Sequence, residues 1–187
     1  MPQILRLTYV SRATFAVDRF TGGIQREVAR ILVQSRRNNP RHQLVGALYF
    51  GDGCFFQCLE GPQEAVEALY ARLHGDPRHG ELRVLSRELV SSPSFSTWAM
   101  KLVPNAQEVQ TLMTRHGRTT FDPYSFDESL RLAMVQLLLR GADAALPPVP
   151  AEPTTAAPTP VAVKAALGLG ILGTALALGS LALQLLR

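Results

Sequence analysis

A glutamine stands inside one of the most apolar stretches of this 187-residue chain. Gln57 lies within the run 54–59, which is otherwise Cys, Phe and Leu and is closed by Glu60-Gly61-Pro62. A short apolar run of this kind predicts a buried strand. A buried carboxamide has about four hydrogen-bonding sites to satisfy, and leaving such a group unpaired costs about 1–3 kcal/mol. The fold must therefore bring a fixed polar partner to Gln57, and a ligand is one candidate for that partner.

The first half of the chain predicts three strands and a helix. Residues 3–10 alternate with a period of two, which places Leu5, Leu7 and Tyr9 on one face of a strand. Apolar residues with helical spacing follow and predict a helix. This helix ends at Asn38-Asn39-Pro40, because the residue before proline avoids the α region. Two apolar strands, 44–50 and 54–59, flank the hairpin signal Gly51-Asp52-Gly53.

The next segment completes one sheet. Pro62 at a first helical position and Gly75 past the end bracket a second helix. Residues 82–90 and 98–103 predict two further strands. The order βαββαββ indicates an α+β, ferredoxin-like arrangement, in which one sheet carries both helices on a single face.

Two more helices are predicted to cover the opposite face of that sheet. Asn105 with Glu108, and Ser125 with Glu128, have the spacing of capping boxes. The second helix carries an apolar stripe of Phe126, Leu130, Ala133, Met134, Leu137 and Leu138. We interpret this pair as a lid on the core and as a signal-output element, two roles that are compatible.

The C-terminal quarter differs in composition from the rest. Residues 146–160 hold six of the thirteen prolines and predict an extended, semi-rigid linker. Residues 165–186 contain no charge and are flanked by Lys164 and Arg187. A helix of this length spans roughly 33 Å, enough to cross a bilayer. We predict a membrane anchor within 161–187; the alternative is a buried soluble helix.

Charge and cysteine content narrow the function classes. The net charge is +4, and the arginines are scattered without an aromatic-basic stripe, so we expect no nucleic-acid partner. Cys54 and Cys58 lie four residues apart on one strand face, too far apart to pair. No cysteine or histidine cluster has metal-ligand spacing, so no metal site is predicted. A reducing cytosol is the expected setting, and no signal peptide is visible.

Several polar and aromatic residues converge on one region of the predicted fold. Tyr9 and Gln57 share a sheet face, Asn38 and Asn39 end the first helix, and Trp98 and Met100 lie on the last strand. A planar ligand between the two helices would have Ile31 and Leu73 against its two faces. Each of these residues has an ordinary structural explanation alone; together with a carboxamide in the core they indicate a binding site.

These residues resemble the BLUF family of blue-light sensors that use FAD. The resemblance covers roughly residues 3–105. Six segments carry it: Tyr9-Val10-Ser11, Ser35-Arg36-Arg37-Asn38-Asn39, Leu44-Val45-Gly46-Ala47-Leu48-Tyr49, Phe55-Phe56-Gln57-Cys58-Leu59-Glu60-Gly61, Asp76-Pro77-Arg78-His79 and Trp98-Ala99-Met100.

The resemblance implies a cofactor and a set of roles. FAD would lie between the helices, with Asn39 on the polar edge of its ring and Gln57 bridging Tyr9 and the ring. Blue light would drive electron and proton transfer from Tyr9, after which Gln57 offers a different hydrogen bond. Trp98 and Met100 would relay the change toward the C-terminal helices. Arg72, Asp76, Arg78 and His79 match positions that contact the rest of the cofactor in relatives, although an exposed ion-pair cluster is an equal interpretation.

The expected protein is a membrane-tethered photoreceptor. Its domains would be a photosensor at 1–104, output helices at 105–145, a linker at 146–160 and the anchor at 161–187. No cyclase-like, phosphodiesterase-like or kinase-like segment is present. We therefore expect no enzymatic activity, and an output through an unidentified downstream protein or a change of assembly, including a homodimer. The expected location is the inner membrane, single-pass, with the sensor in the cytoplasm.

Two other classes remain open at this point. A flavin oxidoreductase would need a nicotinamide or thiol route, and neither a dinucleotide fingerprint nor a CxxC motif is present. A ferredoxin-fold regulator without photoactivity would need no glutamine in its core and would be colourless. An absorption spectrum that changes reversibly under blue light separates the three classes.

Overall fold

A computed structural model describes residues 3–17, 24–95, 99–103 and 106–141 of the chain. Five strands, four α-helices and two short 3₁₀ turns lie in these ranges. In chain order they are β1 (Ile4–Ala13), α1 (Arg26–Asn38), η1 (Asn39–His42), β2 (Val45–Gly51), β3 (Cys54–Pro62), α2 (Gln63–Leu73), β4 (His79–Val90), β5 (Lys101–Leu102), α3 (Ala106–Arg115), η2 (Pro123–Ser125) and α4 (Glu128–Arg140).

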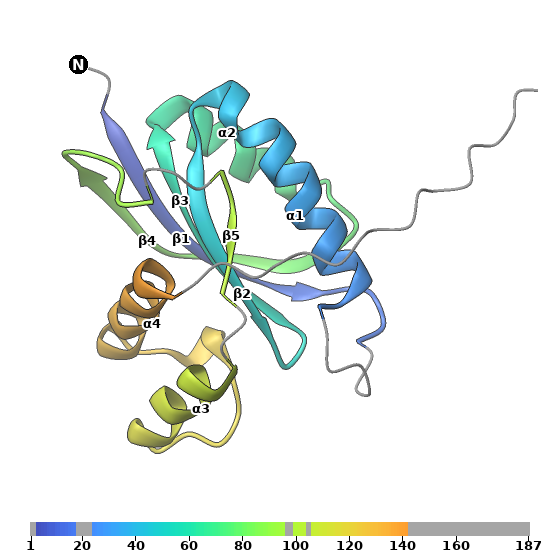
Figure 1. Ribbon diagram of the computed structural model, residues 1–187, viewed down its shortest axis with the longest axis vertical. Coiled ribbons are helices and arrows are strands. Elements are labelled where there is room, and N and C mark those ends of the chain that lie inside the picture. Colours follow the sequence, from blue (N-terminus) through green and yellow to red (C-terminus); the bar gives the residue numbers. More distant parts are fainter. Residues whose placement is uncertain (1–2, 18–23, 96–98, 104–105, 142–187) are drawn as a thin grey trace, which may run out of the picture. The chain divides into compact units, whose positions relative to one another are not determined.

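The strands form one mixed sheet in the order β4-β1-β3-β2-β5. The first four pair antiparallel, whereas β5 joins the edge strand β2 in parallel. Figure 1 shows α1 and α2 on one face of this sheet and α3 and α4 on the other. The predicted βαββαββ order, with two helices on a single face, is confirmed for the described residues.

The pairing of β1 with β3 fixes which side chains meet at the centre of the sheet. Tyr9 is directly opposite Gln57, with Leu7 opposite Leu59 on one side and Ser11 opposite Phe55 on the other. Directly opposed residues of an antiparallel pair point to the same face with their Cβ atoms about 5 Å apart. Tyr9 and Gln57 are therefore neighbours on the face that α1 and α2 cover.

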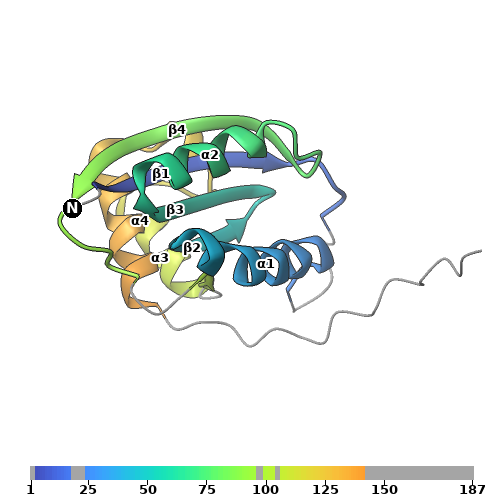
Figure 2. The same ribbon diagram turned by 90° about the horizontal axis from the view of Figure 1, so that it is seen from above.

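Figure 2 shows α1 and α2 on the same side of the sheet. The two helices bury one apolar cluster against it. Leu5, Leu7 and Tyr9 of β1 belong to this cluster, as the alternation predicts. Val28, Ile31 and Leu32 enter it from α1, and Val66 and Tyr70 enter it from α2. Leu69 and Leu73 of α2 are partly buried at its margin.

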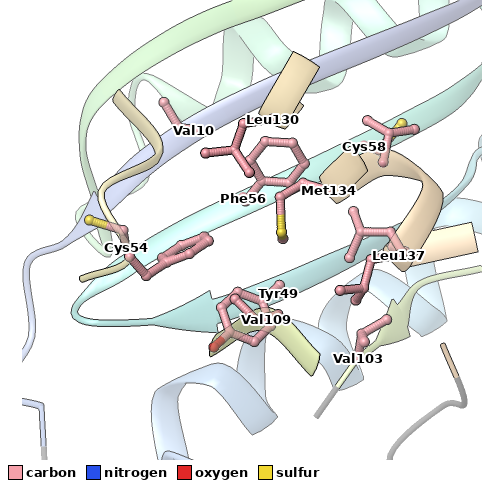
Figure 3. Close-up of a cluster of buried hydrophobic side chains, with 14 of the residues drawn as sticks. Val10, Tyr49, Cys54, Phe56, Cys58, Val103, Val109, Leu130, Met134 and Leu137 are labelled. Carbon is pink, nitrogen blue, oxygen red and sulfur yellow. The ribbon is translucent and has the colours of Figure 1, made fainter. Parts of the chain in front are cut away.

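Helix α4 packs on the opposite face of the sheet, where Figure 3 shows its side chains over those of β2 and β3. Leu130, Met134 and Leu137 lie in one buried cluster with Tyr49 and Phe56. Cys54 and Cys58 are free thiols in the same cluster. The predicted placement of the second helical pair is correct.

The predicted start of α4 is wrong by two residues. The N-cap is Asp127, whose carboxylate accepts the backbone N–H of Leu130, and not Ser125. The Ser125 hydroxyl instead donates to the carbonyl of Asp122 within the preceding turn. Both side chains are good caps, so the turn at Pro123 decides which one is used. Asn105, the other predicted cap, lies outside the described residues.

Strand boundaries also differ from prediction because pairing partners extend some strands and truncate others. Strand β1 runs on to Ala13, which pairs with His79, so β4 begins three residues before the predicted Leu82. Strand β5 is only two residues long within the described chain. Strand β3 continues to Pro62, which is the N-cap of α2 and not its first helical residue.

The predicted linker and membrane anchor lie outside the described residues, which end at Gly141. Within the described part of the chain, no helix combines the length and apolar character needed to cross a bilayer. The domain boundaries given above for the C-terminal quarter remain predictions.

Candidate functional site

A cavity of about 670 Å³ opens between α1 and α2 above the central strands. Its size falls within the range of small-molecule and cofactor sites. Met100 and every residue predicted to bind the cofactor line it: Tyr9, Ile31, Asn38, Asn39, Gln57, Arg72, Leu73, Asp76, Arg78 and His79. Trp98, also predicted here, lies outside the described residues.

Gln57 lies in the cavity wall and is 3% exposed. Its Nε2 is the one buried side-chain nitrogen or oxygen within the described residues that has no hydrogen-bond partner. Proteins rarely leave such a donor unpaired, because the desolvation cost is about 1–3 kcal/mol. The fold thus holds, at the wall of the cavity, a hydrogen-bond donor that has no partner among the described residues and that a bound ligand would satisfy.

Tyr9 lies beside Gln57 and is almost fully buried. Its ring meets the Tyr70 ring edge to face, with the centroids 5.3 Å apart. Burial raises the pKa of Tyr9 well above the usual 10, because the phenolate would lose its hydration. The phenol is therefore protonated across the physiological pH range.

The end of α1 and the start of η1 form a second wall of the cavity and are hydrogen-bonded to the residues before β5. Asn39 is 3% exposed, and its Nδ2 donates to the carbonyl of Ala99 at 2.6 Å. Nε of Arg36 donates to the carbonyl of Met100 at 2.9 Å. The carboxamide assigned to the cofactor's polar edge is thus also tied to the backbone that carries Met100.

Asp76 and Arg78 form a fixed ion pair at the cavity. Nη2 of Arg78 lies 2.6 Å from Oδ2 of Asp76, and Nε and the backbone N–H of Arg78 both donate to Oδ1. These bonds hold the pKa of Asp76 at about 2. Nη2 of Arg78 also donates to Oε1 of Gln34 on α1, so the pair bridges the two sides of the opening. Asp76 and Arg78 thus form an ion pair and also line the cavity, with the exposed Arg72 beside them; their contact with the cofactor stays a prediction.

His79 lines the cavity from the start of β4. Its Nδ1 shares a hydrogen bond of 2.8 Å with the Ser11 hydroxyl, and its ring packs against Phe55 with centroids 4.8 Å apart. Burial lowers the pKa of His79 to about 4, against the opposing effect of Asp76. The imidazole is therefore neutral near pH 7.

Several lining residues escaped sequence reasoning: Gln34, Ser35, His42, Leu44, Leu69, Gly75 and Pro77. Gln34 is exposed at the mouth of the cavity, one turn before Asn38 on the same side of α1. That spacing could have identified it. No group of three potential metal ligands gathers within the described residues.

A sheet with two helices that enclose a cavity, with a buried phenol and carboxamide side by side on its floor, defines a flavin-binding photosensor domain. The chain belongs to the BLUF family, described as "Sensors of blue-light using FAD", whose sequence profile matches residues 4–101. The family binds FAD as its blue-light chromophore.

Solved structures and curated proteins agree with this assignment. The BlsA ground state superposes with a TM-score of 0.68 at 29% identity, covering 76% of this chain and 92% of that chain. A photoactivated adenylate cyclase subunit beta-like protein of Euglena gracilis is 30% identical over 118 residues, or 63% of this chain and 12% of that protein. The antirepressor BluF of Escherichia coli (strain K12), described as blue light- and temperature-regulated, is 30% identical over 77 residues. The match covers 41% of this chain and 19% of that protein. The chain thus spans only a small part of these curated relatives.

The residues present fit FAD. The buried Nε2 of Gln57 needs an acceptor, which the polar edge of a flavin ring supplies, and apolar Ile31 and Leu73 suit its two faces. Arg72, Arg78 and His42 give the cavity donors for the phosphate-bearing part of the cofactor.

Proposed function

We propose that Tyr9 and Gln57 form the light switch of this sensor. The observation that carries the proposal is the unpartnered, buried Nε2 of Gln57 directly across the sheet from Tyr9. A carboxamide has an acceptor at one end and a donor at the other, so turning it over exchanges the two. In a buried site such an exchange has a large energetic effect, because water does not compensate for it.

Bound FAD supplies the absorption of blue light and a strongly oxidising excited state. Tyr9 is the electron and proton donor in this proposal, since its buried phenol keeps its proton in the dark. When the hydrogen bonding beside it changes, the carboxamide of Gln57 reorients, and the reoriented carboxamide is the signalling state. Asn39 links the site to the backbone at Ala99, because its Nδ2 donates to the carbonyl of that residue.

Substitution of the two switch residues tests the proposal. Tyr9→Phe and Gln57→Leu keep the bulk of each side chain, so both variants should hold yellow flavin. Both should lose the reversible red shift under blue light that we expect of the wild type. Tyr49→Phe is the matched control, because Tyr49 is a buried tyrosine on the other face of the sheet, packed against Phe121.

Three outcomes would contradict the proposal. A reversible shift in Tyr9→Phe or Gln57→Leu would remove the role assigned to that residue. A colourless wild type would favour the regulator without flavin. Turnover of a substrate with bleaching by a reductant would favour the oxidoreductase.

We further propose that the output is a change in protein contact or assembly next to a membrane. The support is the uncharged segment 165–186, which has the length of a membrane-spanning helix. The unpaired thiols of Cys54 and Cys58 suit a reducing compartment, and together with a flavin domain they favour a cytoplasmic location for the sensor. The downstream protein, the homodimer and the absence of enzymatic output belong to this proposal.

A further inference from the structure

Lys101 is a charged residue in the interior of the protein. It is 4% exposed and belongs to β5, directly after Met100 of the cavity wall. Successive strand residues point to opposite faces, so Met100 belongs to the cluster under α1 and α2, whereas Lys101 points toward α4. These two neighbours therefore connect the two faces of the sheet.

The Lys101 ammonium meets the last turn of α4. Its Nζ donates to the carbonyls of Leu138 at 3.0 Å and Leu139 at 3.1 Å. The last four carbonyls of a helix have no partner within the helix, and they form its negative end. A buried ammonium is costly unless it is well bonded, so this contact strongly favours one position of β5 relative to α4.

The residues before Lys101 are held from the other side of the sheet. Asn39 and Arg36 bind the carbonyls of Ala99 and Met100, respectively. The ladder between β5 and β2 is short: Ala47 pairs with Lys101 and Leu48 with Leu102. Side-chain contacts at residues 99–101 thus fix a strand that backbone pairing holds only weakly.

We infer that Lys101 is the positioning residue that couples the cavity to the end of α4. The inference rests on the proposed function and deepens it. A change at Asn39 shifts the carbonyl of Ala99, the shift moves Nζ of Lys101, and the last turn of α4 loses its cap. Because α4 ends at Arg140, the loosened turn adjoins the sequence that leads to the predicted linker and anchor.

Hydrogen exchange of residues 134–141 in the full chain, in the dark and under blue light, tests the inference. In the wild type, light should speed exchange in the last turn about tenfold, the equivalent of one hydrogen bond to a charged group. Lys101→Met keeps the length but removes the donor, so its last turn should exchange fast in both conditions. Lys101→Arg, which keeps charge and donors, should retain a light response.

Two further measurements separate this coupling from general damage. Lys101→Met should keep the red shift of the flavin, because residue 101 lies on the face away from the cavity. Arg131→Met is the matched control: Arg131 also tethers α4, through Ser86 and Glu88 of β4, and its loss should leave the light response in place.

Distinct results overturn the inference and the proposed function. A light-dependent change in Lys101→Met equal to that of the wild type overturns the inference, as does a wild type that shifts its spectrum without any change in α4. The second result needs no variant, so it stands even where Lys101→Met does not fold. Loss of the spectral shift in the wild type itself instead overturns the proposed function.

Discussion

At Gln57 a polar side chain occupies a strand position where packing alone would favour leucine. Its neighbours on β3 and across on β2 are apolar and buried, and Nε2 has no partner among the described residues. A residue that weakens the fold in this way is typical of a functional site, where stability and activity make opposite demands. The sequence predicts this residue because a carboxamide in an apolar run needs an explanation.

His79 makes the free energy of unfolding of the protein depend on pH. Its pKa in the folded protein is about 4, below the usual 6.5, because burial disfavours the charged imidazole. Between these values the unfolded chain binds the proton and the folded chain does not, so stability falls as the pH falls through this window. Lowering the pH from 7.5 to 5 should cost about 2 kcal/mol through this group alone.

Urea unfolding of the wild type and His79→Gln at the two pH values checks this effect. The variant should lose about 2 kcal/mol less than the wild type on acidification. Asp76 does not interfere, because its pKa of about 2 places its contribution at lower pH. His74→Gln, at an exposed position after α2, is the control and should behave as the wild type. Equal acid sensitivity of the wild type and His79→Gln would contradict this account.

At the scale of elements, Glu60 fixes Ser94 and Phe95, which follow the end of β4. Its fully buried carboxylate lies 2.7 Å from Nε of Arg6 on β1 and accepts the backbone N–H groups of Ser94 and Phe95. Phe95 in turn fills the core beneath α4. One side chain thereby holds both residues against the sheet.

Glu60→Gln should lower the free energy of unfolding by about 3 kcal/mol, because it leaves Arg6 without its buried partner. Glu67→Gln removes a carboxylate paired with Arg87 at the surface and should change stability by no more than about 0.5 kcal/mol. Chemical denaturation of both variants measures the difference. Similar small effects of the two substitutions would show that Glu60 does not pin the residues after β4.

The element order was predictable, whereas several ends of elements were not. Alternation, proline and glycine signals locate the strands and α1 and α2, because each depends on local sequence. The extension of β4 to His79 depends instead on pairing with Ala13, and the cap at Asp127 depends on the turn at Pro123. Within the site, Tyr9 and Gln57 were predictable from strand phase, but the Arg36 and Lys101 contacts are tertiary and leave no local pattern.

At the scale of the whole molecule, the sheet separates the cofactor cavity from the core under the later helices. One face holds the cavity under α1 and α2, and the other carries the apolar core under α4. Two adjacent residues bond to helices on opposite faces: the Met100 carbonyl accepts from Arg36 of α1, and Nζ of Lys101 donates to Leu138 of α4. This division explains how the one sheet of the described residues forms a cofactor cavity on one side and carries helices on the other.

The proposed membrane anchor makes a prediction about the full chain. We expect the full-length protein to sediment with membranes and the protein without residues 165–187 to stay soluble and yellow. Leu176→Arg places a charge near the middle of the segment, at a cost of about 3 kcal/mol, and should release the protein from membranes, whereas Leu176→Ala should not. A full-length protein that is soluble without detergent would contradict the anchor.

The absorption spectrum of the purified wild-type protein, before and after blue illumination, tests the central claim most directly. The account predicts flavin bands that move slightly to the red in blue light and return in the dark. A protein without flavin, or one whose flavin bands do not respond to light, would contradict it.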